Sequence, residues 1–440
     1  MPLPFTSHKL AAAVALASAA LVSAQASATG FQVREQSAKT LANAFANTAA
    51  GAEDVSFMAY NPAAIGNIDG SQVAGGVSYI DATFELHDAD ASNVLGAPYT
   101  AGASGEGGEG AAVPSFAAKT QLNERWDLGL AIYSPYGLAT KYDEDWIGRY
   151  HAVETELETI DIQPTLNYRA TDRLNLAVGL RAQYADATLS NMVDTSLQSP
   201  APYTPSGEYD ALAEVTGDDW GYGYTLGALY QATERTRLGI SYRSEIDLTL
   251  DGDVRFSSDN PAVDATVDAM NQGGSADLTT PANLNLGVYH QLTDRLALMA
   301  NAEWTEWSSF DELVVEFEDG SNSTTTENWD DTWAFSVGAN YALNQQWTLR
   351  GGLGIDQTPV PSAEYRTPRV PDADRRWASL GATWMPTPEL GITAGYLHIF
   401  GDDVDIDQDG SKPENASRGN LSGEYEVEAD VFALSVDYRF

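Results

Sequence analysis

The side chains best suited to metal chemistry in this chain are three aspartates near its C-terminus. Asp405, Asp407 and Asp409 alternate ahead of Gly410 and match the first half of the D-x-D-x-D-G calcium loop. A complete loop of this kind carries a bidentate Glu at its twelfth position, which is Ala416 here. Because runs of acidic residues are usually solvated, the sequence favours an acidic surface loop over a weak calcium site, and it predicts no other metal site.

Nucleophilic catalysis has little support in this sequence. The chain contains no cysteine, which excludes disulfides, Cys-ligated metals and a thiol nucleophile. The histidines beyond the N-terminal segment are His87, His151, His290 and His398, and none lies beside a G-x-S-x-G nucleophile motif. We therefore expect neither an enzyme nor a cofactor.

The charge of the chain excludes another class of partner. Its 63 acidic and 23 basic residues give a formal net charge of −40. A nucleic-acid partner needs clustered Lys and Arg to neutralise its phosphates, so none is expected. The acidic residues concentrate between stretches of alternating polarity, which indicates solvated, anionic loops.

The N-terminal segment, residues 1–28, is predicted to be a signal peptide. Lys9 supplies a positive n-region, and an apolar stretch from Leu10 to Val22 follows it. The triplet Ala26-Ser27-Ala28 is an A-x-A cleavage site, so we predict cleavage after Ala28, with cleavage after Ala24 as the alternative. The apolar stretch is too short to span a bilayer.

A recurring short turn shows how the remaining chain is organised. Thr171-Asp172-Arg173, Thr233-Glu234-Arg235 and Thr293-Asp294-Arg295 are near copies, and each separates two stretches of alternating polarity. From residue 174 to 184 the even positions are apolar and the odd positions polar or small, with period two. Short turns that alternate with long acidic connections are typical of an outer-membrane β-barrel.

We predict an all-β membrane protein: a 14-stranded antiparallel transmembrane β-barrel over residues 71–440, plugged by a small N-terminal helical hatch over residues 29–70. The even strand number allows the barrel to close, with the tight turns on the periplasmic side and the long loops outside. The expected strands are 71–87, 112–122, 126–134, 157–169, 173–189, 220–232, 235–250, 279–292, 295–317, 329–342, 346–357, 374–386, 389–400 and 422–440.

The hatch is predicted from a change in composition. Arg34 to Ala50 is rich in alanine and has apolar residues at helical spacing. Asn61 then precedes Pro62 and Ala63, as an N-cap precedes a proline at the first helical position. A segment this small has little core of its own, so we place it inside the barrel.

The last strand also indicates an outer-membrane protein of a Gram-negative bacterium. Its alternate residues from Phe432 to Phe440 are apolar, and its terminal Tyr-Arg-Phe is similar to the C-terminal signal that the barrel assembly machinery recognises. The alternative is that Phe440 is only an interfacial aromatic. Contact with outer-membrane lipid and lipopolysaccharide and a monomeric state are expected. Tryptophans near strand ends are assigned to interfacial belts, or in part to the interior: Trp126, Trp304, Trp307, Trp347, Trp377 and Trp384.

Seven short motifs, in one order along residues 30–440, resemble the FadL/TodX family of outer-membrane transporters for hydrophobic compounds. They are Gly30-Phe31-Gln32, Asn61-Pro62-Ala63, Tyr133 to Thr140, Tyr242-Arg243-Ser244-Glu245, Trp304-Thr305-Glu306-Trp307-Ser308, Asp356 to Pro361, and Pro371 to Arg375.

The resemblance implies a transport route. A hydrophobic ligand, most of all a long-chain fatty acid, is captured by the outer loops, binds in a lumen pocket and leaves sideways where the third strand kinks. The kink corresponds to Ser134, Pro135 and Gly137, with Ala111 and Ser134 flanking the opening. Pro135 cannot donate a ladder hydrogen bond and Gly137 has no side chain to pack, so the residues alone also predict broken pairing, or simply a strand end at a loop.

The resemblance also assigns roles in the hatch. Phe31 corresponds to a position whose ring reaches the binding pocket; the alternative is an aromatic packed within the plug. Asn61, Pro62 and Ala63 correspond to a gating or anchoring turn; the alternative is a helix cap alone.

The ligand's head group is less well defined by the sequence. Fatty-acid-binding relatives place basic residues at positions that align here with Asn191 and Asp330, and neither residue is basic. Candidate carboxylate partners are instead Arg181, Arg369 and Arg376. Uptake of aromatic or aliphatic hydrocarbons by the same route is therefore the alternative function. A passive polar porin is a further one, although many inward positions are small rather than charged.

Overall fold

The computed structural model describes residues 30–99, 105–196 and 207–440. The predicted signal peptide and its cleavage site lie outside the described residues. In the described part of the chain, no helix is long and apolar enough to span a membrane.

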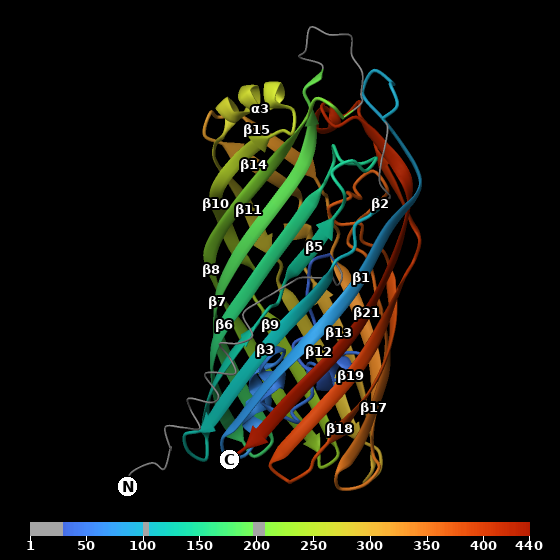
Figure 1. The fold of residues 1–440 in the computed structure, drawn as a ribbon. Helices are drawn as coiled ribbons and strands as arrows, with labels where there is room; N and C mark the ends of the chain where they lie inside the picture. The colour runs from blue at the N-terminus through green and yellow to red at the C-terminus, as the bar shows by residue number, and fades with distance from the viewer. Residues whose placement is uncertain (1–29, 100–104, 197–206) are drawn as a thin grey trace.

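The dominant feature is a closed antiparallel barrel of 14 strands, which confirms the predicted fold class (Figure 1). Closure is made by the first and last strands, whose pairing runs from Gln72 opposite Arg439 to Ser92 opposite Asn420. The barrel strands are β1 (Gln72–Ser92), β3 (Gly110–Gln121), β4 with β5 (Trp126–Tyr133, Gly137–Lys141), β6 (Glu154–Thr171), β7 (Leu174–Asp194), β8 (Asp210–Thr233), β9 with β10 (Thr236–Arg243, Ile246–Ser257), β11 with β12 (Gln272–Thr280, Asn283–Gln291), β13 with β14 (Leu296–Thr305, Glu312–Phe317), β15 with β16 (Asn322–Thr326, Thr332–Ala342), β17 (Trp347–Asp356), β18 (Arg375–Trp384), β19 (Leu390–Gly401) and β21 (Asn420–Arg439).

Several smaller elements lie in the connections between these strands. They are β2 (Gly105–Glu106), α3 (Pro261–Val267), η4 (Asp268–Met270), η5 (Trp307–Ser309), β20 (Val404–Gln408) and η6 (Pro413–Asn415). In Figure 1 the helix α3 lies at the end of the barrel opposite the C-terminus.

The short turns fold as the sequence predicts, for a local reason. In each, the side-chain oxygen of the first residue accepts a hydrogen bond from the backbone N–H two residues on, which fixes the reversal without tertiary contacts. These donor–acceptor pairs are Arg125 to Asn123, Arg173 to Thr171, Arg235 to Thr233, Arg295 to Thr293 and Gln346 to Asn344.

The strands extend further on the loop side than the sequence predicts. The predicted loop 190–219 contains the end of β7 and the start of β8, and the predicted loop 251–278 contains parts of β10 and β11. The sequence does not predict these strand extensions, because both faces of the strands carry polar or small residues there. Three predicted strands are also interrupted: 235–250 at Ser244 and Glu245, 279–292 at Pro281 and Ala282, and 295–317 around η5.

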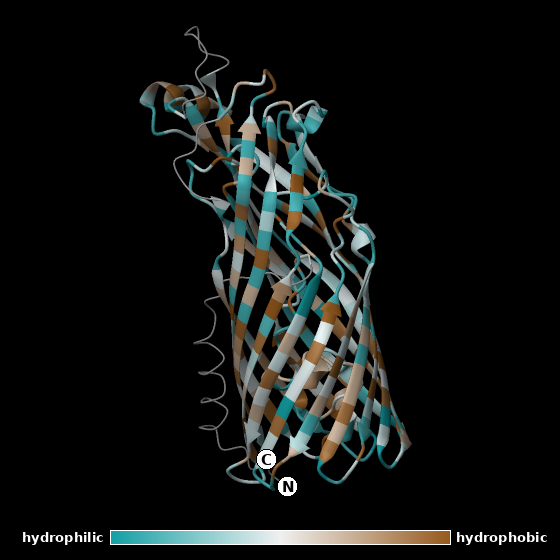
Figure 2. Ribbon diagram, turned by 90° about the vertical axis from the view of Figure 1, so that its right-hand side faces the viewer, coloured by the Kyte–Doolittle hydropathy of each residue, from teal (hydrophilic) through white to brown (hydrophobic). Residues whose placement is uncertain are grey.

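The outer face of the barrel is apolar, as a surface in contact with lipid must be. Alternate side chains such as Leu176, Val178 and Leu180 point outward, and Leu180 is 64% exposed. Figure 2 shows the resulting alternation of hydrophobic and hydrophilic residues along the strands. Trp347 and Trp384 stack at the periplasmic rim, as an interfacial belt requires. Trp307 and Trp377, by contrast, are buried.

The hatch lies inside the barrel, where Figure 1 shows it near the end that holds the C-terminus. It contains α2 (Ala38–Leu41), η1 (Val55–Ala59) and η2 (Pro62–Asn67). In the stretch from Arg34 to Ala50, where the sequence predicts short helices, the only α-helix is the single turn α2, and Ala44 and Phe45 after it adopt left-handed φ angles of 53° and 63°. The Asn61 side chain caps η2 by accepting from the Ala63 N–H at 3.0 Å.

The hatch fits closely against the barrel wall. A Cβ at Gly239 would lie 1.9 Å from the Ala49 carbonyl oxygen, so only glycine permits this approach. Buried ion pairs join the hatch to the strands: Arg34 with Glu303 and Asp356, Lys39 with Asp437, and Glu53 with Arg350.

Candidate functional site

The third barrel strand is interrupted between β4 and β5. Tyr133 pairs with Asp161 and Gly137 pairs with Glu158, so three residues on this strand lie opposite two on β6. One extra residue of this kind is a bulge that bends the strand. In the described ladders β3 pairs with β4 only from Phe116 onward, and β5 pairs with β6 alone.

This interruption leaves a bounded break in the barrel wall. Its flanks are residues 110–115 of β3 and residues 134–139 of the kinked strand. Beyond the break the wall closes again, because Gly108 forms a bridge with Thr140. Ala111 is fully buried and Ser134 is 8% exposed, so the two predicted flanking residues both lie at this break.

The first residues of the hatch supply the kink with the partner that β3 does not. The Gly137 N–H donates to the Phe31 carbonyl at 2.8 Å, and the Val33 N–H donates to the Pro135 carbonyl at 2.9 Å. The hatch therefore behaves as a short extra strand behind the break, and moving it would release these backbone groups.

Side chains complete the attachment of the kink. The Gln36 Nε2 group donates to the Ser134 carbonyl at 3.0 Å. The Tyr136 hydroxyl donates to the Pro281 carbonyl at 2.7 Å, and its backbone N–H donates to Thr159 Oγ1 at 3.0 Å. The backbone polar groups of the kink thus have hydrogen-bond partners on both sides, which explains how a break in the ladder is tolerated.

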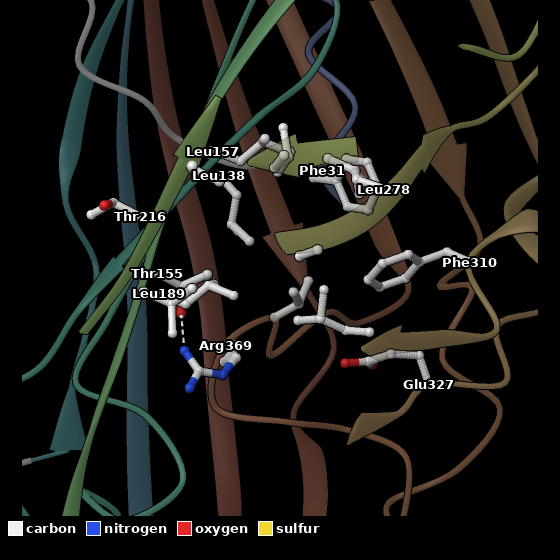
Figure 3. Close-up of a pocket in the computed structure, with 17 residues that line it drawn as sticks. Phe31, Leu138, Thr155, Leu157, Leu189, Thr216, Leu278, Phe310, Glu327 and Arg369 are labelled. Atoms are coloured by element: carbon white, nitrogen blue, oxygen red, sulfur yellow. Dashed lines mark hydrogen bonds between the residues drawn. The ribbon is translucent and has the colours of Figure 1, made fainter. Parts of the chain in front are cut away.

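Next to the kink lies an inner cavity with an empty volume of about 690 Å³ (Figure 3). Leu138 of β5 and Phe31 of the hatch both line it. The Phe31 ring packs edge-on against Trp307 and Phe310, with centroids 4.7 and 5.3 Å away. The remaining lining is Thr155, Leu157, Ala187, Leu189, Val215, Thr216, Gly217, Leu250, Ala276, Leu278, Leu313, Glu327, Arg369 and Val370.

Two ionisable side chains interrupt this apolar lining: Arg369 from the connection between β17 and β18, and Glu327 from the interruption between β15 and β16. Arg369 donates to Thr155 Oγ1 and to Asn191 Oδ1, each at 3.2 Å. Glu327 accepts from the Trp329 indole N–H at 3.2 Å. The inner cavity is therefore amphipathic, with an aromatic region around Phe31 and a charged region at Arg369.

An outer cavity of about 860 Å³ adjoins the inner one. The two share Leu189, Val215, Leu313 and Arg369 in their linings. Arg418 also lines the outer cavity and donates to Thr325 Oγ1 at 3.1 Å. A ligand that passes from the loops into the inner cavity would thus pass Arg369.

Burial shapes the electrostatics where the cavities meet. It raises the pKa of Glu327 to about 8, although Arg369 and Arg418 oppose this effect. Burial and the nearby Arg418 lower the pKa of Arg369 to about 9. The pKa of His151 falls to about 3 for the same reasons, so this imidazole is neutral at physiological pH. The junction carries an excess of positive charge that an anion would relieve.

Of the three predicted carboxylate partners, the structure places Arg369 alone in a cavity lining. Arg181 is fully buried in an ion pair with Asp161 at 2.6 Å. Arg376 is on the outer wall, where it pairs with Asp402 at 3.0 Å.

The aspartates Asp405, Asp407 and Asp409 lie in and after β20 at the surface, and Asp409 accepts a hydrogen bond from the Ser411 N–H. Within the described ranges, no group of three His, Cys, Asp or Glu side chains is arranged to hold a metal ion.

Glu327 and Arg418 are cavity residues that sequence reasoning missed. Both come from loops whose paths depend on distant strands. The only local signal for Glu327 is its position two residues before Trp329, within an otherwise polar stretch.

Fold and site together define a class of protein: an outer-membrane β-barrel with an internal hatch, an amphipathic lumen cavity and a broken wall strand. The family model described as outer membrane protein transport protein (OMPP1/FadL/TodX) matches residues 19–440, and the chain belongs to this family. It is therefore an outer-membrane protein of a Gram-negative bacterium, in a family that transports hydrophobic compounds.

Curated relatives match this chain over nearly its full length. Outer membrane protein P1 of Haemophilus influenzae is 30% identical, over 97% of this chain and 98% of that protein. The long-chain fatty acid transport protein of Escherichia coli O6:H1 is 28% identical and covers 99% of both chains.

Solved structures agree with this assignment. The crystal structure of a Pseudomonas aeruginosa FadL homologue has a TM-score of 0.85 at 30% identity, and the match covers 93% of this chain and 100% of that one. The toluene transporter TodX of Pseudomonas putida has a TM-score of 0.68 at 17% identity, covering 91% of this chain and 98% of that one. At this identity the likeness to TodX shows the fold alone.

Proposed function

We propose that this protein takes up long-chain fatty acids across the outer membrane. The ligand is captured in the outer cavity, binds in the inner cavity and leaves sideways at the break between β3 and β5. One observation carries the proposal: a single apolar cavity has Arg369 in its lining and ends at Phe31, the residue whose carbonyl holds the kink.

The lining of the inner cavity suits an acyl chain with an anionic head. Each buried methylene contributes about 0.8 kcal/mol to binding, so a long chain gains most from the leucine, valine and phenylalanine walls. Arg369 can pair with a carboxylate through its planar guanidinium. Asn191, which aligns with a basic position of relatives, binds Arg369 instead, so the loop supplies the positive charge.

The hatch favours sideways release over an axial route. Three residues after Phe31 in the chain, Arg34 is paired with Glu303 at 2.9 Å and with Asp356 at 2.6 Å inside the barrel. Passing an acyl chain through this network would break buried ion pairs and leave charges unpaired. The break in the wall instead opens toward lipid, where an apolar chain needs no hydration.

Phe31 links binding to release in this scheme. Its ring lies in the cavity lining, and its carbonyl accepts from the Gly137 N–H of the kink. A ligand that displaces the ring would also disturb this hydrogen bond. The turn at Asn61, Pro62 and Ala63 anchors the far end of the hatch, since the Asn61 amide donates to the Ala228 carbonyl of β8 at 3.3 Å.

A hydrocarbon is the competing ligand, because it matches the whole lining except the region around Arg369 and Glu327. The test is uptake of radiolabelled oleate, hexadecane and toluene by cells with and without the protein. We expect the protein to accelerate oleate uptake most. Faster uptake of hexadecane or toluene would assign a hydrocarbon channel, and no acceleration of any of the three would contradict the proposal.

A further inference from the structure

Glu327 is the carboxyl group of the inner cavity. It follows β15 directly, and its backbone N–H donates to the Asp311 carbonyl at 2.8 Å. The residue is only 2% exposed and lines the same cavity as Arg369. Figure 3 shows both side chains at the same end of the cavity, on opposite sides, with Leu138, Leu157 and Leu278 further along. An acidic group here is unexpected for a site that takes an anion.

The side chains of Glu327 and Arg369 do not pair with each other. Within the part of the chain that the structure describes, no salt bridge joins Glu327 to Arg369. Arg369 donates to Thr155 and Asn191, and Glu327 accepts from the Trp329 indole. Each side chain is therefore held by its own neighbours, and a polar head group can lie between them.

The surroundings decide the ionisation of Glu327. Arg369 and Arg418 face it and favour its anion, whereas Glu414 of η6 disfavours it. His151, which lies near both arginines, is neutral. Burial outweighs these charges and raises the pKa of Glu327 to about 8, so the empty site holds this carboxyl mainly in its protonated form at neutral pH.

We propose that protonated Glu327 is the second head-group contact of the site: its O–H donates to the ligand carboxylate, whose charge faces Arg369. The inference rests on the proposed uptake of fatty acids. Two ionised carboxylates in one buried site would repel each other, so a bound fatty acid anion requires the proton on Glu327. Glu327 thus acts as a specificity residue. It makes the binding of an anionic ligand depend on pH, whereas the binding of a neutral ligand does not depend on pH.

The direction of the pH effect follows from this linkage. Dodecanoate is an anion throughout the range from pH 6.5 to 8.5, whereas Glu327 loses its proton within that range. Binding of dodecanoate to the detergent-solubilised protein should be about fourfold weaker at pH 8.5 than at pH 6.5. At pH 8.5, titration in buffers of different ionisation enthalpy should show uptake of about 0.8 proton per dodecanoate bound.

A neutral ligand and matched variants separate this effect from a structural role. Dodecanol should bind equally at both pH values. Glu327→Gln keeps a hydrogen-bond donor but cannot titrate, so its affinity for dodecanoate should fall far less between pH 6.5 and pH 8.5 than that of the wild type, because only Arg369 then begins to lose its proton. Glu312→Gln, an exposed glutamate on β14, should keep the wild-type profile.

The outcomes decide between the two proposals. If dodecanoate and dodecanol bind to the wild type and neither depends on pH, the role of Glu327 is wrong and fatty acid binding stands. The role is equally wrong if Glu327→Gln keeps the wild-type pH slope. If dodecanoate does not bind at either pH, the proposed function fails with it. The wild-type comparison of the two ligands needs no variant, so it holds even if Glu327→Gln does not fold.

Discussion

At the scale of single residues, the proposed function makes the choice of ligand depend on Arg369. Replacing Arg369 by Gln removes the positive charge that faces the inner cavity while retaining hydrogen-bond donors. Hydrogen bonds to charged groups contribute about 1.5–3 kcal/mol, so we expect dodecanoate to bind roughly 10- to 100-fold more weakly. Calorimetric titration of the purified protein with dodecanoate and dodecanol measures the effect, and dodecanol should be unaffected.

Arg376 is the matched control for this prediction. It has the same chemistry but lies on the outer wall beside Asp402, with a side chain that is 68% exposed. Arg376→Gln should bind both ligands as the wild type does. If Arg369→Gln and the wild type bound dodecanoate with equal affinity, Arg369 would not be the residue that contacts the ligand carboxylate.

The sequence could narrow the head-group residue to a few arginines and no further. The sequence alone does not distinguish Arg181, Arg369 and Arg376, because the role of each depends on which groups surround it in the fold. In the structure Arg181 is occupied by Asp161 and Arg376 faces outward. The different surroundings of these arginines result from strand register and from loop packing between residues far apart in the sequence. Local residue spacing does not indicate either of these.

At the scale of elements, the interrupted third strand is the feature to test. We predict that replacing Ala111 and Ser134 together by Arg fills the break and abolishes oleate uptake. Dodecanoate binding should persist, because neither residue lines the inner cavity. Uptake by cells and titration of the purified protein separate transport from binding.

The control for this variant keeps the same chemistry away from the break. Ser71→Arg with Ala342→Arg adds two arginines near the periplasmic rim and should leave uptake unchanged. Outer-membrane assembly of both variants is checked by heat-dependent gel migration. Normal oleate uptake through an assembled Ala111→Arg, Ser134→Arg barrel would exclude the lateral route.

Elements fixed by local interactions were the ones that the sequence predicted. The Thr-Asp-Arg turns are held by Thr171, Thr233 and Thr293 accepting from backbone two residues on, so they could be counted and the strand number deduced. Pro135 likewise predicted broken pairing or a strand end, since it cannot donate to a ladder, whereas the kink itself was implied by the family resemblance. That Phe31 and Val33 replace the missing partner is a contact across about a hundred residues, and nothing local indicates it.

At the scale of the whole molecule, the acidic charge is related to the length of the strands, because many carboxylates lie on the parts of the strands that extend beyond the apolar band. With a net charge of −40, the chain keeps many of its carboxylates in loops and on the outward face of the strand extensions beyond the apolar band. Cross-strand neighbours there include Glu158 opposite Asp186 and Asp186 opposite Asp218. Like charges in direct opposition destabilise a sheet, so these extensions depend on solvation and on salt for their stability.

We propose that the hatch determines whether this barrel is a selective transporter or an open pore. Its ion pairs with Glu303, Asp356, Asp437 and Arg350 fix it to the wall at several heights, and the wall around it is lined by small and polar residues. Deleting residues 31–70 would leave this polar lining around water. We therefore predict that the deletion variant admits small polar solutes, which liposome swelling in arabinose measures, while the wild type stays closed.

The same deletion separates the transporter from a passive polar porin. A porin would admit arabinose with the hatch in place, so swelling of wild-type liposomes would favour that alternative. The deleted barrel keeps every strand ladder, including the closure of β1 on β21, so its assembly should survive. It also loses Phe31 and Val33, which hold the kink, so oleate binding should weaken as arabinose flux appears. An assembled deletion variant that remains impermeable to arabinose would show that the loops, rather than the hatch, close the barrel.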